Sequence, residues 1–120
     1  MTGQPKPARV KTYTAETGLV YQYYFVGKRK ALDEAGTEFI FDVSSDRRVR
    51  FSVSVIIPES SLTAWRDEHG RALVDAEVYA AAKMQLTRAF DQEEDLFEKG
   101  RRQPVDAPTL AALLATLGVE

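Results

Sequence analysis

A chain of 120 residues in which 44% are hydrophobic and 28% are charged has the composition of one globular domain and not that of a disordered segment. The absence of cysteine excludes a disulfide scaffold, thiolate catalysis and cysteine-ligated zinc, and a formal net charge of −2 gives no overall attraction to nucleic acid or acidic membranes. No apolar run approaches the roughly 18 residues of a membrane span, and the first residues lack the apolar core of a secretory signal, so we expect a cytoplasmic protein without a membrane segment.

The first half of the chain predicts β-strands. Residues 1–8 contain two prolines and are expected to be a flexible lead-in, so we place a single domain at 9–120. The segment RVKTYT (9–14) predicts a short edge strand. Three longer segments rich in valine, isoleucine, phenylalanine and tyrosine predict further strands at 19–27, 37–44 and 48–58. The charged residues that follow Gly27 are expected to form a connection.

The second half of the chain changes to a helical period. ESSLTAWRDEHG predicts a short helix that is capped by Ser60 or Ser61 and ends at a glycine. Asp75 is expected to cap a longer helix that continues to Gly100, because apolar residues recur there at helical spacing. DAPTLAALLATLG (106–118) predicts a last helix with leucines on one face, capped by its first residue, Asp106.

Strands first and helices afterwards indicate an α+β fold. We expect an antiparallel β-meander of three to four strands followed by three helices, of which at least two pack on one face of the sheet. Register follows from matching apolar with apolar side chains, because successive residues of a strand point to opposite faces. This rule pairs Phe41 with Phe51 on the inner face and sets Asp42 opposite Arg50 on the outer face.

The strand LVYQYYFVG (19–27) divides unequally between the two faces. Leu19, Tyr21, Tyr23 and Phe25 form the larger and wholly apolar or aromatic set, which we assign to the core beneath the helices. The outer face should then carry apolar and charged side chains together, a mixture that is also common on sheets that touch only water. The candidate partner-binding residues on that face are Val20, Tyr24, Val26, Ile40, Arg48 and Arg50.

The sequence contains no recognisable catalytic or cofactor signature. His69 is the only histidine; it lies at a helix end, where it can bond to terminal carbonyls, and no serine or carboxylate is placed to form a triad with it. No glycine-rich phosphate loop is present. We therefore predict no catalytic residue, no cofactor and no metal site, and we favour a non-catalytic protein.

The acidic stretch at 91–95 has two interpretations, a cation-binding site and a solvated helix face. Asp91, Glu94 and Asp95 have helical i, i+3, i+4 spacing and could share a face that binds a hard cation. The ordinary explanation is a solvated helix face, which we prefer.

Three functional hypotheses stay open. The first is a protein–protein interaction or self-association module that uses the outer sheet face or the leucine helix. The second is a single-stranded nucleic-acid-binding module that uses basic loops with Arg29, Arg48 and Tyr24. The third is a small-ligand-binding domain or enzyme with a pocket between sheet and helices. The residues available to such a pocket are carboxylates, tyrosines, Trp65, Arg66 and His69.

Overall fold

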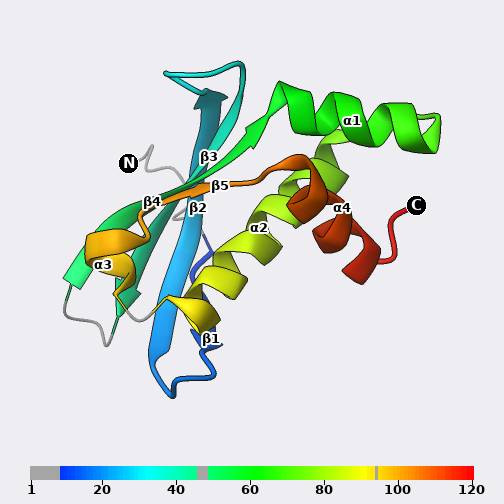
Figure 1. Ribbon diagram of the computed structural model, residues 1–120. Coiled ribbons are helices and arrows are strands. Elements are labelled where there is room, and N and C mark those ends of the chain that lie inside the picture. Colours follow the sequence, from blue (N-terminus) through cyan, green and yellow to red (C-terminus); the bar gives the residue numbers. More distant parts are fainter. Residues whose placement is uncertain (1–8, 46–48, 94) are drawn as a thin grey trace, which may run out of the picture.

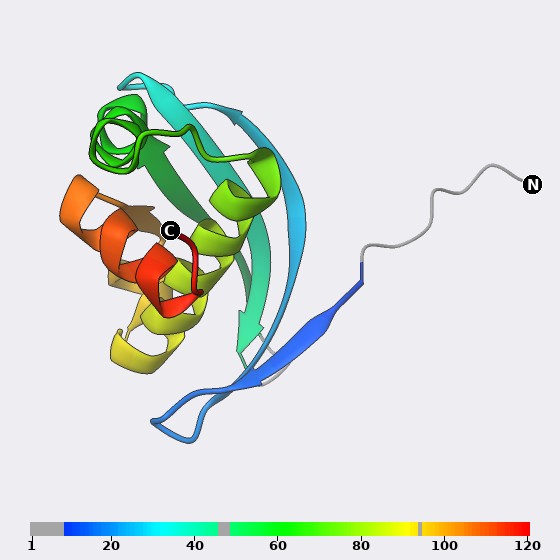
Figure 2. The same cartoon turned by 90° about the vertical axis from the view of Figure 1, so that its right-hand side faces the viewer.

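A five-stranded sheet with helices on one of its faces makes up the part of the chain that the computed structural model describes, residues 9–45, 49–93 and 95–120 (Figure 1). Figure 2 shows the sheet nearly edge-on, with the helices together on its concave side. The predicted α+β class, with an N-terminal meander covered by helices on one face, is therefore confirmed.

Four strands form an antiparallel meander in chain order: β1 (Lys11–Thr14), β2 (Val20–Lys30), β3 (Gly36–Ser45) and β4 (Val49–Pro58). A fifth strand, β5 (Arg102–Pro104), pairs in parallel with β4. The sequence did not predict β5, because three residues ending in proline carry no strand pattern. β2 also runs further than predicted, since the charged residues 28–30 continue the strand instead of forming a connection.

The helices are α1 (Glu59–His69), α2 (Asp75–Gln92), α3 (Leu96–Lys99) and α4 (Ala107–Thr116). The predicted long helix is divided, because α2 ends at Gln92 and Asp95 begins a new turn. The Asp95 side chain accepts a hydrogen bond from the backbone N–H of Glu98 at 3.1 Å. Leu96 is buried and fastens this turn to the core.

Two predicted helix caps have different outcomes. Asp106 caps α4 as predicted, accepting a hydrogen bond from the backbone N–H of Thr109 at 2.9 Å. Neither Ser60 nor Ser61 caps α1, which begins one or two residues earlier without a side-chain cap. The buried Ser61 hydroxyl instead donates to the carbonyl of Val105 at 2.9 Å, so it ties α1 to the segment after β5.

The N-terminus of α2 is held by Glu77 and Arg71. Asp75 is the first residue of the helix, and Val74 takes the cap position that Asp75 was expected to fill. The Glu77 carboxylate accepts the backbone N–H of Val74 at 3.0 Å and pairs with the Arg71 guanidinium, Nη2 to Oε2, at 2.9 Å. The hydrogen bond from Arg71, followed by that from Val74, lowers the pKa of Glu77 to about 2.

The parity of the β3–β4 pairing is as predicted, but its register is shifted by two residues. Phe41 lies opposite Val53 instead of Phe51, and Asp42 lies opposite Ser52 instead of Arg50. A slip of two residues keeps every side chain on the same face, so matching polarity cannot detect it.

The division of the first long strand between two faces is confirmed for its inner set. Tyr21 and Tyr23 are 2% and 6% exposed, and both contact Phe90 of α2, which is fully buried. The rings of Tyr21 and Phe90 are stacked, with centroids 4.3 Å apart. These aromatic residues therefore hold α2 on the sheet, as the sequence pattern predicts.

A β-bulge interrupts β2 between Phe25 and Gly27. Phe25 pairs with Phe41, Gly27 pairs with Ile40, and Val26 is the extra residue. Beyond the bulge, the odd- and even-numbered side chains of β2 exchange faces, so Lys28 pairs with a residue whose side chain is on the inner face. The bulge thus moves a lysine from the outer face to the side of the helices.

Candidate functional site

The sheet face turned away from the helices is covered by no described element (Figure 2). We call it the open face; its side chains include those of Val20, Gln22, Tyr24, Ile40, Asp42, Ser44 and Arg50. Of the predicted partner-binding residues, Val20, Tyr24, Ile40 and Arg50 lie on it, and Val20 is 40% exposed. Val26, at the bulge, is 57% exposed. Arg48 lies outside the described residues.

Tyr24, Asp42 and Arg50 form one hydrogen-bonded cluster on the open face. The Tyr24 hydroxyl donates to Asp42 Oδ2 at 3.0 Å and accepts from Arg50 Nη2 at 2.9 Å. Arg50 also donates to both carboxylate oxygens of Asp42, at 3.0 and 3.2 Å. The hydrogen bond and charge of Asp42 raise the pKa of Arg50 above its usual range. Each polar group of the cluster is therefore fixed by the other two.

A shallow groove of about 280 Å³ runs beside this cluster. Gln22 and Ser44 contribute polar groups to it, and Val10, which precedes β1, contributes an exposed apolar side chain. The groove thus joins apolar surface to hydrogen-bonding groups that are held in place by one another.

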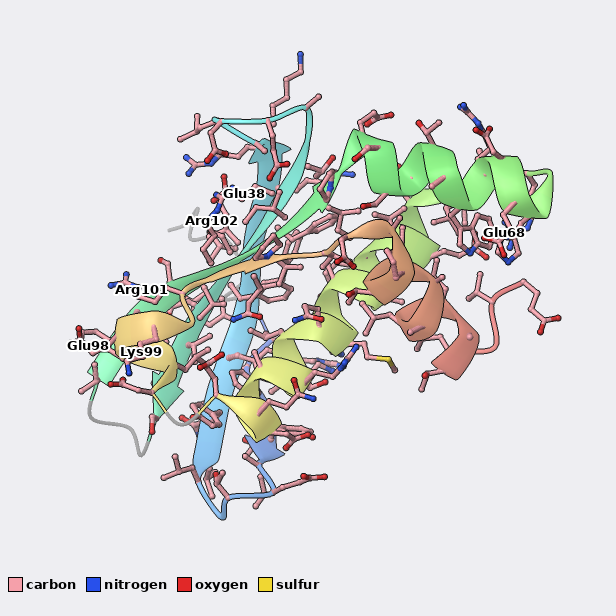
Figure 3. All side chains as sticks on the ribbon, viewed as in Figure 1. Glu38, Glu68, Glu98, Lys99, Arg101 and Arg102 are labelled. Carbon is pink, nitrogen blue, oxygen red and sulfur yellow. The ribbon has the colours of Figure 1, made fainter. Side chains whose placement is uncertain are left out.

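A second ionic cluster closes one end of the open face. Glu38 is only 7% exposed; it accepts from Arg29 Nε at 3.0 Å and from the Ser54 hydroxyl at 2.6 Å. These two hydrogen bonds, that from Arg29 first, hold the pKa of Glu38 below its usual range. Arg102 lies nearby (Figure 3) and is itself paired with Asp33 at 3.0 Å.

The sequence did not predict Glu38 as a buried carboxylate. Arg29 and Glu38 are direct cross-strand partners, but only because the bulge shifts the register of the β2–β3 pair. An isolated glycine within a strand is the available signal for such a bulge, and Gly27 was interpreted as a strand end instead.

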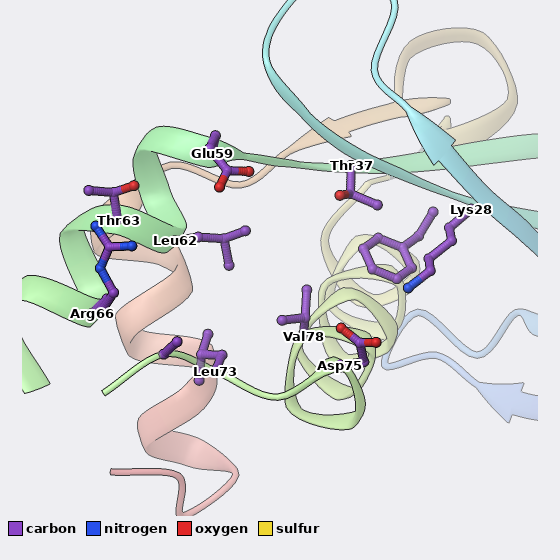
Figure 4. Close-up of a pocket in the computed structure, with 11 residues that line it drawn as sticks. Lys28, Thr37, Glu59, Leu62, Thr63, Arg66, Leu73, Asp75 and Val78 are labelled. Atoms are coloured by element: carbon purple, nitrogen blue, oxygen red, sulfur yellow. The ribbon is translucent and has the colours of Figure 1, made fainter. Parts of the chain in front are cut away.

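A cavity of about 220 Å³ lies between the inner face of the sheet, α1 and the start of α2 (Figure 4). Its apolar lining comes from Phe39, Leu62, Leu73 and Val78, and its charged lining from Lys28, Glu59, Arg66 and Asp75. Lys28 and Asp75 lie on one side of the space, with Thr63 and Arg66 of α1 across it. Of the residues proposed from sequence for such a pocket, Arg66 lines it and Trp65 and His69 do not.

The His69 side chain packs against Trp65 at the end of α1. Its ring stacks on Trp65 with centroids 4.0 Å apart, and its Nδ1 lies 3.0 Å from the carbonyl oxygen of Trp65. Arg71 covers the same indole, with its guanidinium carbon 5.1 Å from the ring centroid. The prediction that His69 contacts a carbonyl at a helix end is confirmed.

The acidic stretch does not form one helical face, because α2 ends at Gln92. Asp91 accepts hydrogen bonds from the Tyr13 hydroxyl at 2.7 Å and from the backbone N–H of Glu16 at 3.0 Å. Asp95 caps α3, and Glu94 lies outside the described residues. Within residues 9–45, 49–93 and 95–120, no group of three or more acidic or histidine side chains is placed to hold a metal ion.

Comparison with known proteins matches no family model, no curated protein and no solved structure. Among the helices of the described segments, none combines the length and apolar character needed to cross a membrane.

Proposed function

We propose that the chain is a non-catalytic interaction domain whose open face binds another protein, either a different chain or a second copy of itself. The cluster of Tyr24, Asp42 and Arg50, flanked by the exposed Val20 and Val26, is the observation that carries the proposal. Tyrosine and arginine are enriched at the centres of protein interfaces. Because hydrogen bonds already fix these side chains, less conformational entropy is lost when a partner binds.

Nucleic-acid binding has weaker support. Two of the arginines that could contact phosphates are engaged by carboxylates, Arg29 by Glu38 and Arg50 by Asp42. Lys28 is turned to the inner cavity by the bulge. The Tyr24 ring also has the Arg50 guanidinium carbon 5.8 Å from its centroid, which restricts stacking by a base.

Binding of a small molecule is a second candidate function, favoured by the inner cavity. Its volume of about 220 Å³ lies below the roughly 300–1,000 Å³ typical of sites for drug-sized ligands, so it suits a small metabolite. The apolar floor and the surrounding charges of both signs would accept a ligand with an apolar body and a polar end.

The interaction proposal is tested with two matched substitutions. Val26→Asp places a charge beside the open face, whereas Val74→Asp makes the same change at a residue of similar exposure next to α2, 57% against 58%. Sedimentation velocity of the wild type and both variants across micromolar concentrations measures self-association. Proximity labelling in cells, with each variant carrying the labelling enzyme, measures contact with a different protein.

We expect Val26→Asp to reduce dimerisation, or labelling of one partner, and Val74→Asp to leave both unchanged. A chain that is monomeric and whose labelled proteins are the same for all three versions would overturn the proposal. For the cavity, a thermal-shift screen of metabolites should identify compounds that raise the melting temperature of the wild type but not of a Leu62→Trp variant that fills the space.

A further inference from the structure

Three basic side chains converge on a hollow at the edge of the sheet. Lys11 is the first residue of β1, Arg9 lies two residues before it, and Lys83 comes from α2. The hollow measures about 170 Å³, and the rest of its lining is aromatic: Tyr23, Tyr24, Phe25 and Tyr79. None of the described residues that line it is acidic. We call this feature the basic hollow.

The basic hollow lies at the N-terminal end of β1, where the pairing of β1 with β2 begins. The first pair of that ladder joins Lys11 to Tyr23, and no described strand pairs with the same edge of β2 from Tyr24 onward. Arg9 and Val10 therefore precede the ladder, beside a stretch of β2 that is paired only on its other side. This arrangement leaves room at the sheet edge without a neighbouring strand to fill it.

The positive charge of the basic hollow is not neutralised by any described carboxylate. No ion pair within the described residues involves Arg9, Lys11 or Lys83, whereas Arg29, Arg50 and Arg102 on the other parts of the sheet each have an acidic partner. On α2, the residues one turn from Lys83 are Tyr79, Ala80, Leu86 and Thr87, so no acidic neighbour is within reach along the helix. Three like charges around one space repel each other unless an anion separates them.

We propose that the basic hollow binds the phosphate group of a phosphate monoester. A dianion matches three cations better than a single carboxylate does, because arginine supplies a planar pair of donors and the lysines supply point charges. Two of the aromatic residues that line the hollow, Tyr23 and Tyr79, carry neutral hydroxyl groups. Burial raises the pKa of Tyr79 and of Tyr23, so both phenols stay protonated at neutral pH and are able to donate hydrogen bonds.

A phosphate group fits this space better than a nucleic-acid backbone does. The hollow holds one anionic group and a few more atoms, and on the adjoining open face Arg29 and Arg50 are already paired with Glu38 and Asp42. Along the described part of the sheet, no continuous basic track therefore leads away from the hollow, as repeated phosphate contacts would require.

The test is a titration with phenyl phosphate at constant ionic strength, followed by ¹H–¹⁵N correlation spectra of the labelled full chain. We expect saturable shifts of the amides of Lys11, Tyr24 and Lys83. Lys83→Gln should weaken binding about tenfold, because a charge-assisted hydrogen bond is lost. Lys30→Gln removes the same charge from an exposed position outside the hollow and should leave the affinity unchanged.

The pH dependence gives an independent readout. The second pKa of a phosphate monoester is about 6, so affinity for phenyl phosphate should rise up to about tenfold between pH 5 and 7. Sulfate is a dianion throughout this range, and its affinity should not change in the same way. A phosphotyrosine peptide that binds more tightly than phenyl phosphate would identify a phosphorylated protein as the source, and the reverse order would identify a small metabolite.

Three results would overturn the proposal: unsaturable shifts, equal weakening by Lys83→Gln and Lys30→Gln, or tighter binding of oligothymidylate than of either phosphate monoester. Each variant is first checked for an unchanged melting temperature, and Lys11→Gln replaces Lys83→Gln if the latter destabilises α2. Tyr24 lines both the basic hollow and the groove of the open face, but Lys11 and Lys83 line only the hollow, so the lysine variants test it separately from the proposed protein interaction.

Discussion

Arg50 reaches Asp42 diagonally across the sheet, although Ser52 is the residue directly opposite Asp42. The guanidinium places two donors on the carboxylate, at 3.0 and 3.2 Å, and a third contact on the hydroxyl of Tyr24. Diagonal neighbours of this kind are within reach of long side chains. The opposite-charge pair that the sequence predicts therefore exists, but Arg50 lies two residues from the position directly opposite Asp42.

Replacing Arg50 with lysine should separate charge from geometry in this cluster. The Arg50→Lys variant keeps the positive charge and loses the paired donors. Because the Arg50 side chain is 65% exposed, we expect only a small change in the free energy of unfolding, and less in high salt than in low salt. Urea unfolding at the two salt concentrations measures it. A large loss that persists in high salt would show that the cluster is a stability element instead of a binding surface.

Glu77 should make the stability of the fold depend on acid pH. Its folded pKa of about 2 lies below the ordinary glutamate value, so its ion pair with Arg71 contributes fully above that ordinary value. The contribution is lost as the pH falls from about 4.5 towards 2. Melting temperatures recorded over this window should fall less steeply for Glu77→Gln than for the wild type. Glu68→Gln, on an exposed site of α1, serves as the control and should retain the wild-type slope.

Glu38→Gln should destabilise the fold, because Glu38 is nearly buried and binds both Arg29 and Ser54. We expect a loss of about 1–3 kcal/mol in the free energy of unfolding, the usual cost of disturbing a buried charged hydrogen bond. A double-mutant cycle with Arg29→Gln isolates the pairwise part. Additive effects of the two substitutions would contradict the assignment of Arg29 as the main partner.

Gly36 and Gly27 should respond differently to the same substitution. A Cβ atom added to Gly36 would lie 2.7 Å from the carbonyl oxygen of Ile57 and 2.8 Å from the Cα of Pro58, both backbone atoms. We therefore expect Gly36→Ala to lower the free energy of unfolding by about 1–3 kcal/mol, as overpacking does. A Cβ atom at Gly27 meets nothing within 4 Å, so Gly27→Ala should be almost neutral. Chemical denaturation of both variants tests the contrast, and equal effects would refute it.

Sequence reasoning succeeded where burial decides the structure. Tyr21 and Tyr23 were assigned to the core because the alternative set contains the polar Gln22, and both tyrosines pack on Phe90. It failed where backbone geometry decides. The slip of two residues between β3 and β4 leaves every side chain on its expected face, so polarity carries no information about it.

The candidate sites show the same division. The apolar and aromatic members of the open face could be predicted, since alternation alone places Val20 and Tyr24. For the inner cavity, a pocket between sheet and helices that uses Arg66 could be proposed, but its other charged lining could not be predicted, because Lys28 reaches it only through the bulge at Val26 and Asp75 comes from a different helix. The basic hollow joins Lys11 to Lys83, which are brought together by packing between distant segments that no local pattern reveals.

The parallel pairing of β5 with β4 also has a consequence for how the protein is made. Ser54 pairs with Arg102, and Val105 donates its backbone N–H to the carbonyl of Ile56 at 2.9 Å, so one edge of the sheet is completed only by residues that follow three of the helices. When the ribosome has released the residues up to the end of α2, strands β1–β4 are already outside it. The edge of β4 that later pairs with β5 then has no partner strand. Such an edge is open to pairing with other chains until β5 has been synthesised. The arrival of β5 is therefore the step that ends the period in which the nascent chain is most prone to aggregation.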